Sequence, residues 1–180
     1  MSVKIIQKEN KILRKSAKEV PLDLIKSEEI QTIIRKMKEA IIENEEAIAI
    51  AAPQIGESLR IFLISEYVFE PENKEKKKTD YGFLVFINPK ILKKSHKQKI
   101  LTEGCLSVAG FYGTVKRSEK IKIEAYDENG KKFIKSGAGL FSQAIQHEMD
   151  HLDGILFTDK ALVLKRIPQN NQNNLPHKSA

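Results

Sequence analysis

Cysteine and tryptophan are nearly absent from this 180-residue sequence, which contains one cysteine and no tryptophan. With Cys105 alone no internal disulfide can form, and this usage fits a reducing compartment, so we expect a cytoplasmic protein. Long apolar runs are absent too: no stretch approaches the roughly 20 residues that a membrane helix needs. Residues 1–16 also lack the apolar core of a signal peptide. The sequence therefore predicts no membrane partner.

Acidic residues are too few to balance the basic ones, and the formal net charge is +7. The excess lies in two lysine-rich segments, NKEKKKTD (73–80) and LKKSHKQK (92–99). These segments lack the interleaved aromatic residues that stacking on bases would require, and the chain has no glycine-rich phosphate loop, so we expect no DNA partner. We interpret both segments as solvated loops and strand edges. The alternative is a weak electrostatic association with an RNA-rich surface such as that of the ribosome.

The chain length fits one domain with a single hydrophobic core. We expect this domain to span residues 1–165, followed by a polar, mobile tail over 166–180. Isoleucines and a methionine recur at helical spacing over 27–44, which predicts an N-terminal amphipathic helix. Two apolar runs, 59–65 and 83–91, predict buried strands.

Three further segments have clear local signals. A proline and a glycine predict a loop for AIAIAAPQIG (47–56). Alternating residues on both sides of Asn129-Gly130 predict a hairpin with a type I′ turn. Helical spacing returns over 140–154, where Gly154 predicts the end of a second helix.

Within the second predicted helix, two histidines and a glutamate have the spacing of a metal site. His147 and His151 stand four residues apart, so a helix places them one turn apart on the same face, where both rings can reach one ion. Glu148 lies about 100° round the helix axis, where it can act on a water molecule without being a ligand. The pattern predicts a catalytic metal site. The alternative is a pair of buried histidines satisfied by their neighbours.

Two histidines do not complete a metal site, so a third ligand must come from elsewhere in the chain. His96 lies in a lysine-rich segment and His177 in the polar tail, which are poor positions for a rigid site. Cys105 lies in LTEGCLSVAG (101–110), beside a glycine that would allow a close backbone approach, although a lone cysteine is usually a small buried hydrophobic residue. We therefore expect Cys105 and the two helical histidines to bind one ion per chain, with a fourth position open to water.

The chain contains, in this order, the segments AIAIAAPQ (47–54), EGCLS (103–107) and QHEMDHL (146–152). Together these motifs resemble those of the peptide deformylase family. INPKI (87–91), Arg117 and GILFTDK (154–160) also fall where that family has similar residues. The resemblance spans most of residues 1–160, and it implies a hydrolase that removes the formyl group from the N-formylmethionine of nascent polypeptides and releases formate.

From the predicted elements and this resemblance, we expect an α+β fold in which mixed and antiparallel sheets pack around the central helix that carries HExxH. The resemblance implies the same three metal ligands and Glu148 as the general base. It also implies that the side-chain amide of Gln54 and the backbone N–H of Leu106 face the formyl oxygen. By resemblance the native ion is Fe²⁺, with Zn²⁺, Ni²⁺ or Co²⁺ able to replace it. A thiolate ligand favours a soft or borderline ion, but the residues alone do not separate iron from zinc.

The resemblance also implies which residues bind substrate. They are Ile48, Ala49, Leu101, Glu103, Gly104, Leu140 and Ala144. Of these, Leu101, Leu140 and Ala144 match positions that line the methionine pocket. In addition, Glu46 and Arg117 match a pair of charges that would brace the segment of Gln54, although they could equally form an ordinary ion pair.

Five residues depart from the family pattern. Alanines replace glycines at Ala47 and Ala49, Ala109 replaces a proline, Tyr112 an arginine and Gln143 an apolar residue. In an extended segment residues 47, 49 and 51 share a face, so we expect their methyl groups to line up beside the substrate and to narrow its space. The alternative is that this face looks into the core. We expect these departures to change substrate preference rather than the metal site.

Two other functions stay open. The first is a zinc endopeptidase built on the same HExxH helix, which would recruit a third ligand downstream, where only Asp153, Asp159 and His177 stand. The second is a catalytically silent metal-binding protein associated with the ribosome. The glutamate at 148 favours an enzyme, because a purely structural metal site needs no base there.

Overall fold

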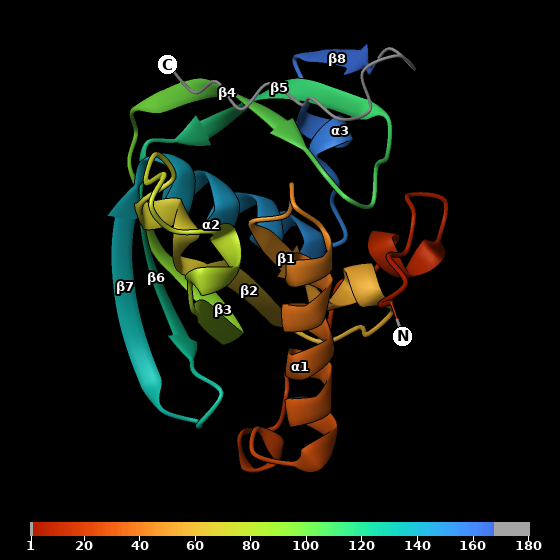
Figure 1. The fold of residues 1–180 in the computed structure, drawn as a ribbon, viewed down its shortest axis with the longest axis vertical. Coiled ribbons are helices and arrows are strands. Elements are labelled where there is room, and N and C mark those ends of the chain that lie inside the picture. The colour runs from red at the N-terminus through yellow and green to blue at the C-terminus, as the bar shows by residue number, and fades with distance from the viewer. Residues whose placement is uncertain (1, 168–180) are drawn as a thin grey trace.

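The computed structural model describes residues 2–167 and contains two antiparallel sheets and three α-helices (Figure 1). The helices are α1 (Glu28–Glu43), α2 (Gly139–Leu152) and the short α3 (Phe157–Lys160). The strands are β1 (Ala49–Ala51), β2 (Ile61–Ser65), β3 (Phe83–Lys94), β4 (Gln98–Gly104), β5 (Phe111–Ser118), β6 (Lys120–Tyr126), β7 (Lys132–Ala138) and β8 (Val163–Arg166).

The larger sheet has the strand order β1-β2-β3-β6-β7, and the smaller sheet has the order β4-β5-β8. Every strand pair in both sheets is antiparallel, and one isolated parallel bridge joins Lys18 to Leu59. In Figure 1, α2 lies between the larger sheet and the β4-β5-β8 sheet, while α1 extends away from the smaller sheet. The predicted α+β fold is therefore confirmed, with sheets that are antiparallel rather than mixed.

Strand β2 divides the hydrophobic core into two clusters because it is buried on both faces. Ile61 and Leu63 belong to the cluster that packs against α1, whereas Phe62 and Ile64 belong to the cluster that packs against α2. Alternate residues of a strand point to opposite faces, so an uninterrupted apolar run is what a two-sided strand requires. This explains why residues 61–64 of this segment are all apolar.

Helix α1 begins where the sequence predicts. The Ser27 hydroxyl accepts a hydrogen bond from the Ile30 N–H, and two glutamates occupy the first turn, where they complement the helix dipole. The buried residues of α1 all lie on the face toward the sheet; they are Ile30, Ile33, Ile34, Met37, Ala40 and Ile41. An amphipathic helix stabilised by one buried face is the result.

Helix α2 is buried for most of its length and ends at a required glycine. Gly154 has a φ of +73°, and a Cβ built there would lie 2.8 Å from the backbone carbon of Arg14. The N-terminal segment therefore passes directly over the end of α2, with the Ala17 N–H donating to the Leu152 carbonyl. Only glycine combines this left-handed conformation with such a close backbone approach.

The segment over 47–56 is more regular than the predicted loop. Residues 49–51 pair with β2, and a 3₁₀ turn over Ala52–Ile55 follows. Ala49 and Ala51 pack against the cluster on the α2 side, but Ala47 packs against the α1 side. The prediction that residues 47, 49 and 51 share one face is wrong, because Ala47 still belongs to the turn after α1 and its N–H bonds to the Asn44 carbonyl.

The hairpin between β6 and β7 is present, but its turn is not type I′. A type I′ turn needs a positive φ at both central residues, whereas Gly130 has a φ of +76° and Asn129 does not have a positive φ. The Asp127 carboxylate accepts from the backbone N–H groups of Asn129 and Lys131, and the Gly130 N–H bonds to the Asp127 carbonyl. A turn stabilised by the Asp127 side chain, followed by Gly130 in the left-handed conformation, replaces the predicted type I′ turn.

The C-terminal boundary lies slightly beyond the predicted one. Strand β8 continues to Arg166, and the predicted tail from residue 168 onward lies outside the described residues. Of the lysine-rich segment 92–99, the first part ends β3 and the last part begins β4, and its lysines are exposed. Within residues 2–167 we find no helix that is both long and apolar enough to cross a membrane.

We expect Asn88 to hold the N-terminal segment against β3. Its φ is +49°, its Oδ1 accepts from the Val20 N–H at 2.8 Å, and its Nδ2 donates to the Val20 carbonyl at 2.7 Å. Asn88→Ala should lower the free energy of unfolding in urea by about 2–4 kcal/mol, through both lost hydrogen bonds and the strained φ. Asn88→Gly, which removes only the hydrogen bonds, should cost less. Equal losses for the two variants would contradict a contribution from the backbone conformation.

Candidate metal centre

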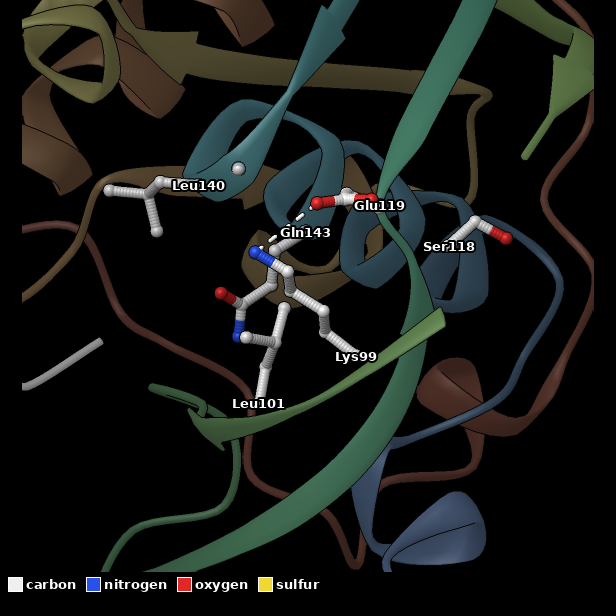
Figure 2. Close-up of a pocket in the computed structure, with 7 residues that line it drawn as sticks. Lys99, Leu101, Ser118, Glu119, Leu140 and Gln143 are labelled. Atoms are coloured by element: carbon white, nitrogen blue, oxygen red, sulfur yellow. Dashed lines mark ion pairs between the residues drawn. The ribbon is translucent and has the colours of Figure 1, made fainter. Parts of the chain in front are cut away.

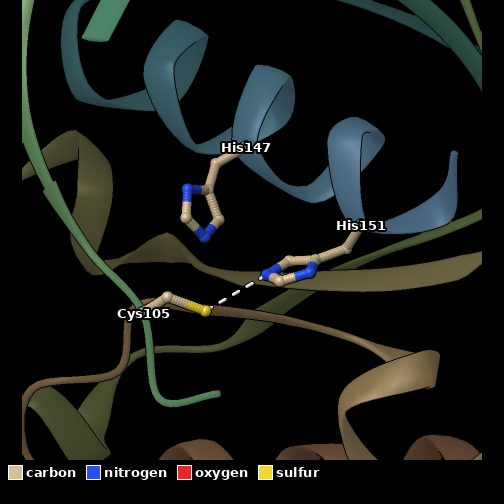
Figure 3. Close-up of side chains that lie close together, drawn as sticks. All are labelled: Cys105, His147 and His151. Carbon is tan, nitrogen blue, oxygen red and sulfur yellow. Dashed lines mark hydrogen bonds between the residues drawn. The ribbon is translucent and has the colours of Figure 1, made fainter. Parts of the chain in front are cut away.

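Three residues from two parts of the chain converge beside α2. His147 and His151 lie one turn apart on the helix, and Cys105 lies just after β4. The distance from Cys105 Sγ to His151 Nε2 is 3.2 Å, and one ligand atom from each residue lies within 4.8 Å of the others. Figure 3 shows both rings and the sulfur turned toward one another. Cys105 is therefore the partner of the two helical histidines, whereas His96 lies near the β3–β4 turn.

The donor set and its surroundings fit a divalent ion. One thiol and two imidazoles suit a soft or borderline ion. His147 directs Nδ1 toward Glu103 Oε2 at 2.9 Å, which leaves its Nε2 for a ligand. Within residues 2–167, two buried side-chain nitrogen or oxygen atoms lack a hydrogen-bond partner, and both belong to this site: Glu148 Oε2 and His151 Nδ1. Unpaired buried polar atoms are costly, so their concentration here marks a place where a further group binds.

The Glu148 carboxyl lies beside the histidines in an almost dry environment. Its side chain is 3% exposed, and this burial raises its pKa to about 7. The negative charge of Glu103 adds to the effect, while the positive charges of His147 and Arg117 oppose it. A carboxyl with a pKa near neutrality can both take and give a proton, as a general base must.

Gln54 reaches the same site from the 3₁₀ turn after β1. Its Nε2 lies 3.4 Å from Cys105 Sγ and 3.2 Å from Ser107 Oγ, and its Oε1 accepts from the Ala51 N–H at 2.8 Å. The amide group is thus held in one orientation beside the cysteine. Ser107 is fully buried and was not among the predicted site residues, although it lies within the EGCLS motif.

Leu106 follows Cys105 in the loop between β4 and β5. Its carbonyl accepts a hydrogen bond from Gln7 Nε2 at 3.0 Å, and its backbone N–H bonds to no other residue of the segment that the structure describes. Gln7 therefore fixes the loop that carries both Cys105 and Leu106. No sequence motif points to Gln7, because its contact joins two segments about 100 residues apart in the chain.

A buried charge network lies behind His147. Arg117 donates to both carboxylate oxygens of Glu103, at 2.7 and 2.8 Å, and to Asp150 Oδ2 at 2.7 Å. Burial opposes ionisation of Glu103, but the hydrogen bonds from Arg117 and His147 outweigh it and lower its pKa to about 2. Lys160 completes the network through Asp150 Oδ1. Both side-chain oxygens of Glu103 are therefore occupied by protein partners.

The predicted pairing of Arg117 with Glu46 is wrong. Glu46 is exposed in the turn between α1 and β1, whereas Arg117 is buried on β5. In the β4-β5 register, Lys99 pairs with Arg117 and Glu103 with Gly113, so Arg117 and Glu103 share the inward face of the two strands. The long arginine side chain reaches along this face to the carboxylate.

Two of the predicted pocket residues line a cavity beside this centre. Leu101 from β4 and Leu140 from α2 face a cavity of about 220 Å³, together with Gln143 (Figure 2). Ala144 is instead buried in the cluster on the α2 side and is not among the lining residues of this cavity. Leu140, Gln143 and His147 follow one face of the helix, so the cavity begins one helical turn from His147, although no residue of the metal centre itself lines it.

The remaining predicted substrate residues lie along strand edges. Ile48 and Ala49 are half-buried at the start of β1, which is an edge strand of the larger sheet. Gly104 is exposed at the end of β4, directly before Cys105. An edge strand leaves backbone groups available to an added peptide strand.

Comparison with known proteins agrees with this geometry. The family model for polypeptide deformylase matches residues 2–166. The chain belongs to the peptide deformylase family. Among its relatives, the chain is 40% identical to peptide deformylase 1 of Clostridium perfringens, over 86% of this chain and 94% of that protein. It is 37% identical to the chloroplastic peptide deformylase 1A of Solanum lycopersicum, covering 87% of this chain but only 58% of that protein.

Solved structures of the family have the same fold. A peptide deformylase from Legionella pneumophila is 37% identical and superposes with a TM-score of 0.75, covering 89% of this chain and 86% of that chain. The deformylase of Synechococcus elongatus, solved in complex with actinonin, is 31% identical with a TM-score of 0.75, covering 89% of this chain and 79% of that chain. This likeness confirms the mixed α+β architecture.

Removing Arg117 should destabilise the protein far more than removing Lys160, the more exposed cation of the same network. Arg117→Met leaves Glu103 and Asp150 buried without their cation, so the free energy of unfolding should fall by about 3–5 kcal/mol. The matched control, Lys160→Met, removes a cation whose side chain is 41% exposed. It should cost no more than about 1 kcal/mol. Urea unfolding of both variants measures the difference, and similar losses would contradict a dominant role for Arg117.

Proposed function

We propose that this protein is a metal-dependent hydrolase that removes the formyl group from the N-terminal formylmethionine of nascent polypeptides and releases formate. The observation that carries the proposal is the cluster of Cys105, His147 and His151 with the unpaired Glu148 carboxylate beside it, in a chain of the peptide deformylase family. The proposed single catalytic domain is the one expected over residues 1–165, extended by the end of β8 at Arg166. The decisive experiment is an assay of formate release from formyl-Met-Ala-Ser with Fe²⁺ supplied under anaerobic conditions.

The proposed cofactor is one Fe²⁺ per chain, held by Cys105, His147 and His151, with Zn²⁺, Ni²⁺ or Co²⁺ able to replace it. When bound, such an ion supplies Lewis acidity toward water and toward the formyl carbonyl. The hydrogen bond between His147 Nδ1 and Glu103 supports this assignment, because it fixes the ring with Nε2 toward the ligand position. Arg117 in turn holds the Glu103 carboxylate ionised.

Glu148 acts as the general base in this proposal. It takes a proton from the water that attacks the formyl carbon, and it later delivers that proton to the departing amine. Its burial, its pKa of about 7 and its unpaired Oε2 support the role. The C–N bond of the formamide breaks, so formate and a free N-terminal amine are the products.

Gln54 and Leu106 would stabilise the charge that develops on the formyl oxygen. The Gln54 amide is held through Oε1, which keeps its Nε2 donor beside Cys105 and Ser107, where the formyl oxygen would lie. The Leu106 N–H is available beside it. Loss of one such donor typically costs about 3–4 kcal/mol of transition-state stabilisation.

The substrate would lie as an extended peptide along strand edges near the centre. Backbone groups of Ile48 and Ala49 on one side, and of Glu103 and Gly104 on the other, are suited to pair with it. The first side chain would enter the cavity lined by Leu101 and Leu140. Ala144 is buried in the cluster between α2 and the larger sheet. It would contribute to the shape of this region rather than touch the substrate.

The open alternatives are less well supported. For a zinc endopeptidase, Asp153 pairs with Arg60 and Asp159 pairs with Arg14, so neither carboxylate is directed to the centre; His177 lies outside the described residues. A catalytically silent protein would have no use for a buried carboxylate with an unpaired oxygen. We further propose a cytoplasmic location and a weak association with the ribosome surface through the exposed lysines of 92–99.

Cys105→Ala should abolish stoichiometric metal binding, because the remaining two histidines do not complete a site. Elemental analysis of the purified variant measures this directly. The matched control is Ser107→Ala, which removes a buried neighbour of Gln54 but no proposed ligand, and which should keep one ion per chain. Full metal occupancy in Cys105→Ala would show that the third ligand is another residue.

Glu148→Gln should retain the metal but lose most turnover, because an amide cannot accept the proton from water. The expected loss in kcat is roughly 10²–10⁴-fold, the usual contribution of a positioned base. Metal content and formate release are measured on the same sample. A variant that loses its metal, yet turns over normally once metal is resupplied, would make Glu148 a ligand or a bystander.

A further inference from the structure

The cavity beside the metal centre combines apolar walls with polar groups that methionine does not require. Leu101 and Leu140 line two sides of this space of about 220 Å³, while Lys99, Glu119 and Gln143 also face it (Figure 2). A pocket for an apolar side chain needs no amide or ion pair in its wall. Their presence indicates a substrate group that they recognise.

Chain direction fixes the order of these groups along the cavity. On β4, Leu101 precedes Cys105, and Lys99 lies two residues farther back, away from the metal centre. On α2, Gln143 lies one turn before His147. A side chain that enters from the metal centre therefore meets Gln143 and Leu101 first and Lys99 at the far end.

Both nitrogen groups in the cavity keep a donor to spare. Gln143 Nε2 carries two hydrogens, and one is used by the Thr102 carbonyl at 2.8 Å. Lys99 Nζ carries three hydrogens and contacts Glu119 Oε1 at 3.2 Å. A thioether sulfur is only a weak acceptor, so methionine offers the spare Gln143 hydrogen no good partner. Lys99, whose side chain is 54% exposed, keeps contact with water at the open end of the cavity.

We propose that this cavity takes a side chain with an apolar stem and a strong acceptor at its tip, and that the protein deformylates peptides that begin with formyl-methionine sulfoxide as well as formylmethionine. The inference rests on the proposed deformylase function. The two leucines contact the methylene stem, and the sulfoxide oxygen accepts from Gln143 Nε2 and Lys99 Nζ. The reaction is the same hydrolysis of the formyl C–N bond, and the sulfoxide is neither reduced nor oxidised.

The test compares kcat/KM for three peptides: formyl-Met-Ala-Ser, its methionine sulfoxide form, and formyl-norleucine-Ala-Ser, which has the stem but no acceptor. For the unmodified holoenzyme, we expect kcat/KM of the sulfoxide peptide to be within about threefold of that of the methionine peptide. The polar contacts to the sulfoxide oxygen compensate for the apolar contacts that its larger tip loses. Gln143→Leu and Lys99→Met should each lower the ratio of sulfoxide to norleucine by about tenfold. Lys97→Met is the matched control: Lys97 also pairs with Glu119, but it does not line the cavity, so the ratio should not change.

The outcomes separate the two proposals. Both variants could release formate from the norleucine and methionine peptides and keep the sulfoxide-to-norleucine ratio of the unmodified enzyme. This result would overturn the recognition of the sulfoxide. Rejection of the sulfoxide peptide by the unmodified enzyme, by more than about a hundredfold, would overturn it as well. No formate from any of the three peptides would instead overturn the deformylase function itself. If Gln143→Leu fails to fold because it loses its contact with Thr102, the Lys99→Met ratio decides alone.

Discussion

The guanidinium of Arg117 ties together the three elements that build the candidate metal centre. It lies on β5, binds Glu103 at the end of β4 and binds Asp150 on α2. Cys105 follows Glu103 by two residues, and His151 follows Asp150 directly, so each ion pair fixes a ligand-bearing segment. A buried cation between two carboxylates tolerates little displacement, because any gap leaves a charge without a partner. The geometry of the ligands therefore depends on charges that never touch the metal.

Burial of α2 between two sheets supplies the second constraint. The helix packs its apolar residues on the larger sheet and turns its histidines toward the loop after β4. Its end is held by the close approach of the N-terminal segment at Gly154. Because the helix is immobilised along its length, the two imidazoles and Glu148 keep a fixed relation to Cys105. A rigid helix gives more accurate positions than a loop would.

The polar groups of the site divide into two kinds. Glu103, Arg117 and Asp150 satisfy one another completely and serve as a rigid support. Glu148 and Gln54 are different, because Glu148 has an unpaired oxygen and the Gln54 amide contacts only weak or exchangeable acceptors on one side. Satisfied groups maintain the structure, while groups with spare capacity are available to a ligand. Gln143, one of the departures from the family pattern, belongs to the second kind, because its Nε2 keeps a hydrogen beyond the one given to the Thr102 carbonyl.

The sequence by itself determined the two main helices, the two-sided strand β2 and the three residues of the candidate metal centre. Each of these depends on local spacing or on rare residue types: the isoleucines of α1, the uninterrupted apolar residues 61–64, and the histidines and single cysteine. Only the tertiary structure decided which partner Arg117 has, that Gln7 holds the loop after Cys105, and that Ala47 and Ala49 face different clusters. Those contacts join segments far apart in the chain, and they follow from strand register and from the way the sheets enclose α2. Neither is encoded in the spacing of neighbouring residues, because register and packing are set by the whole core at once.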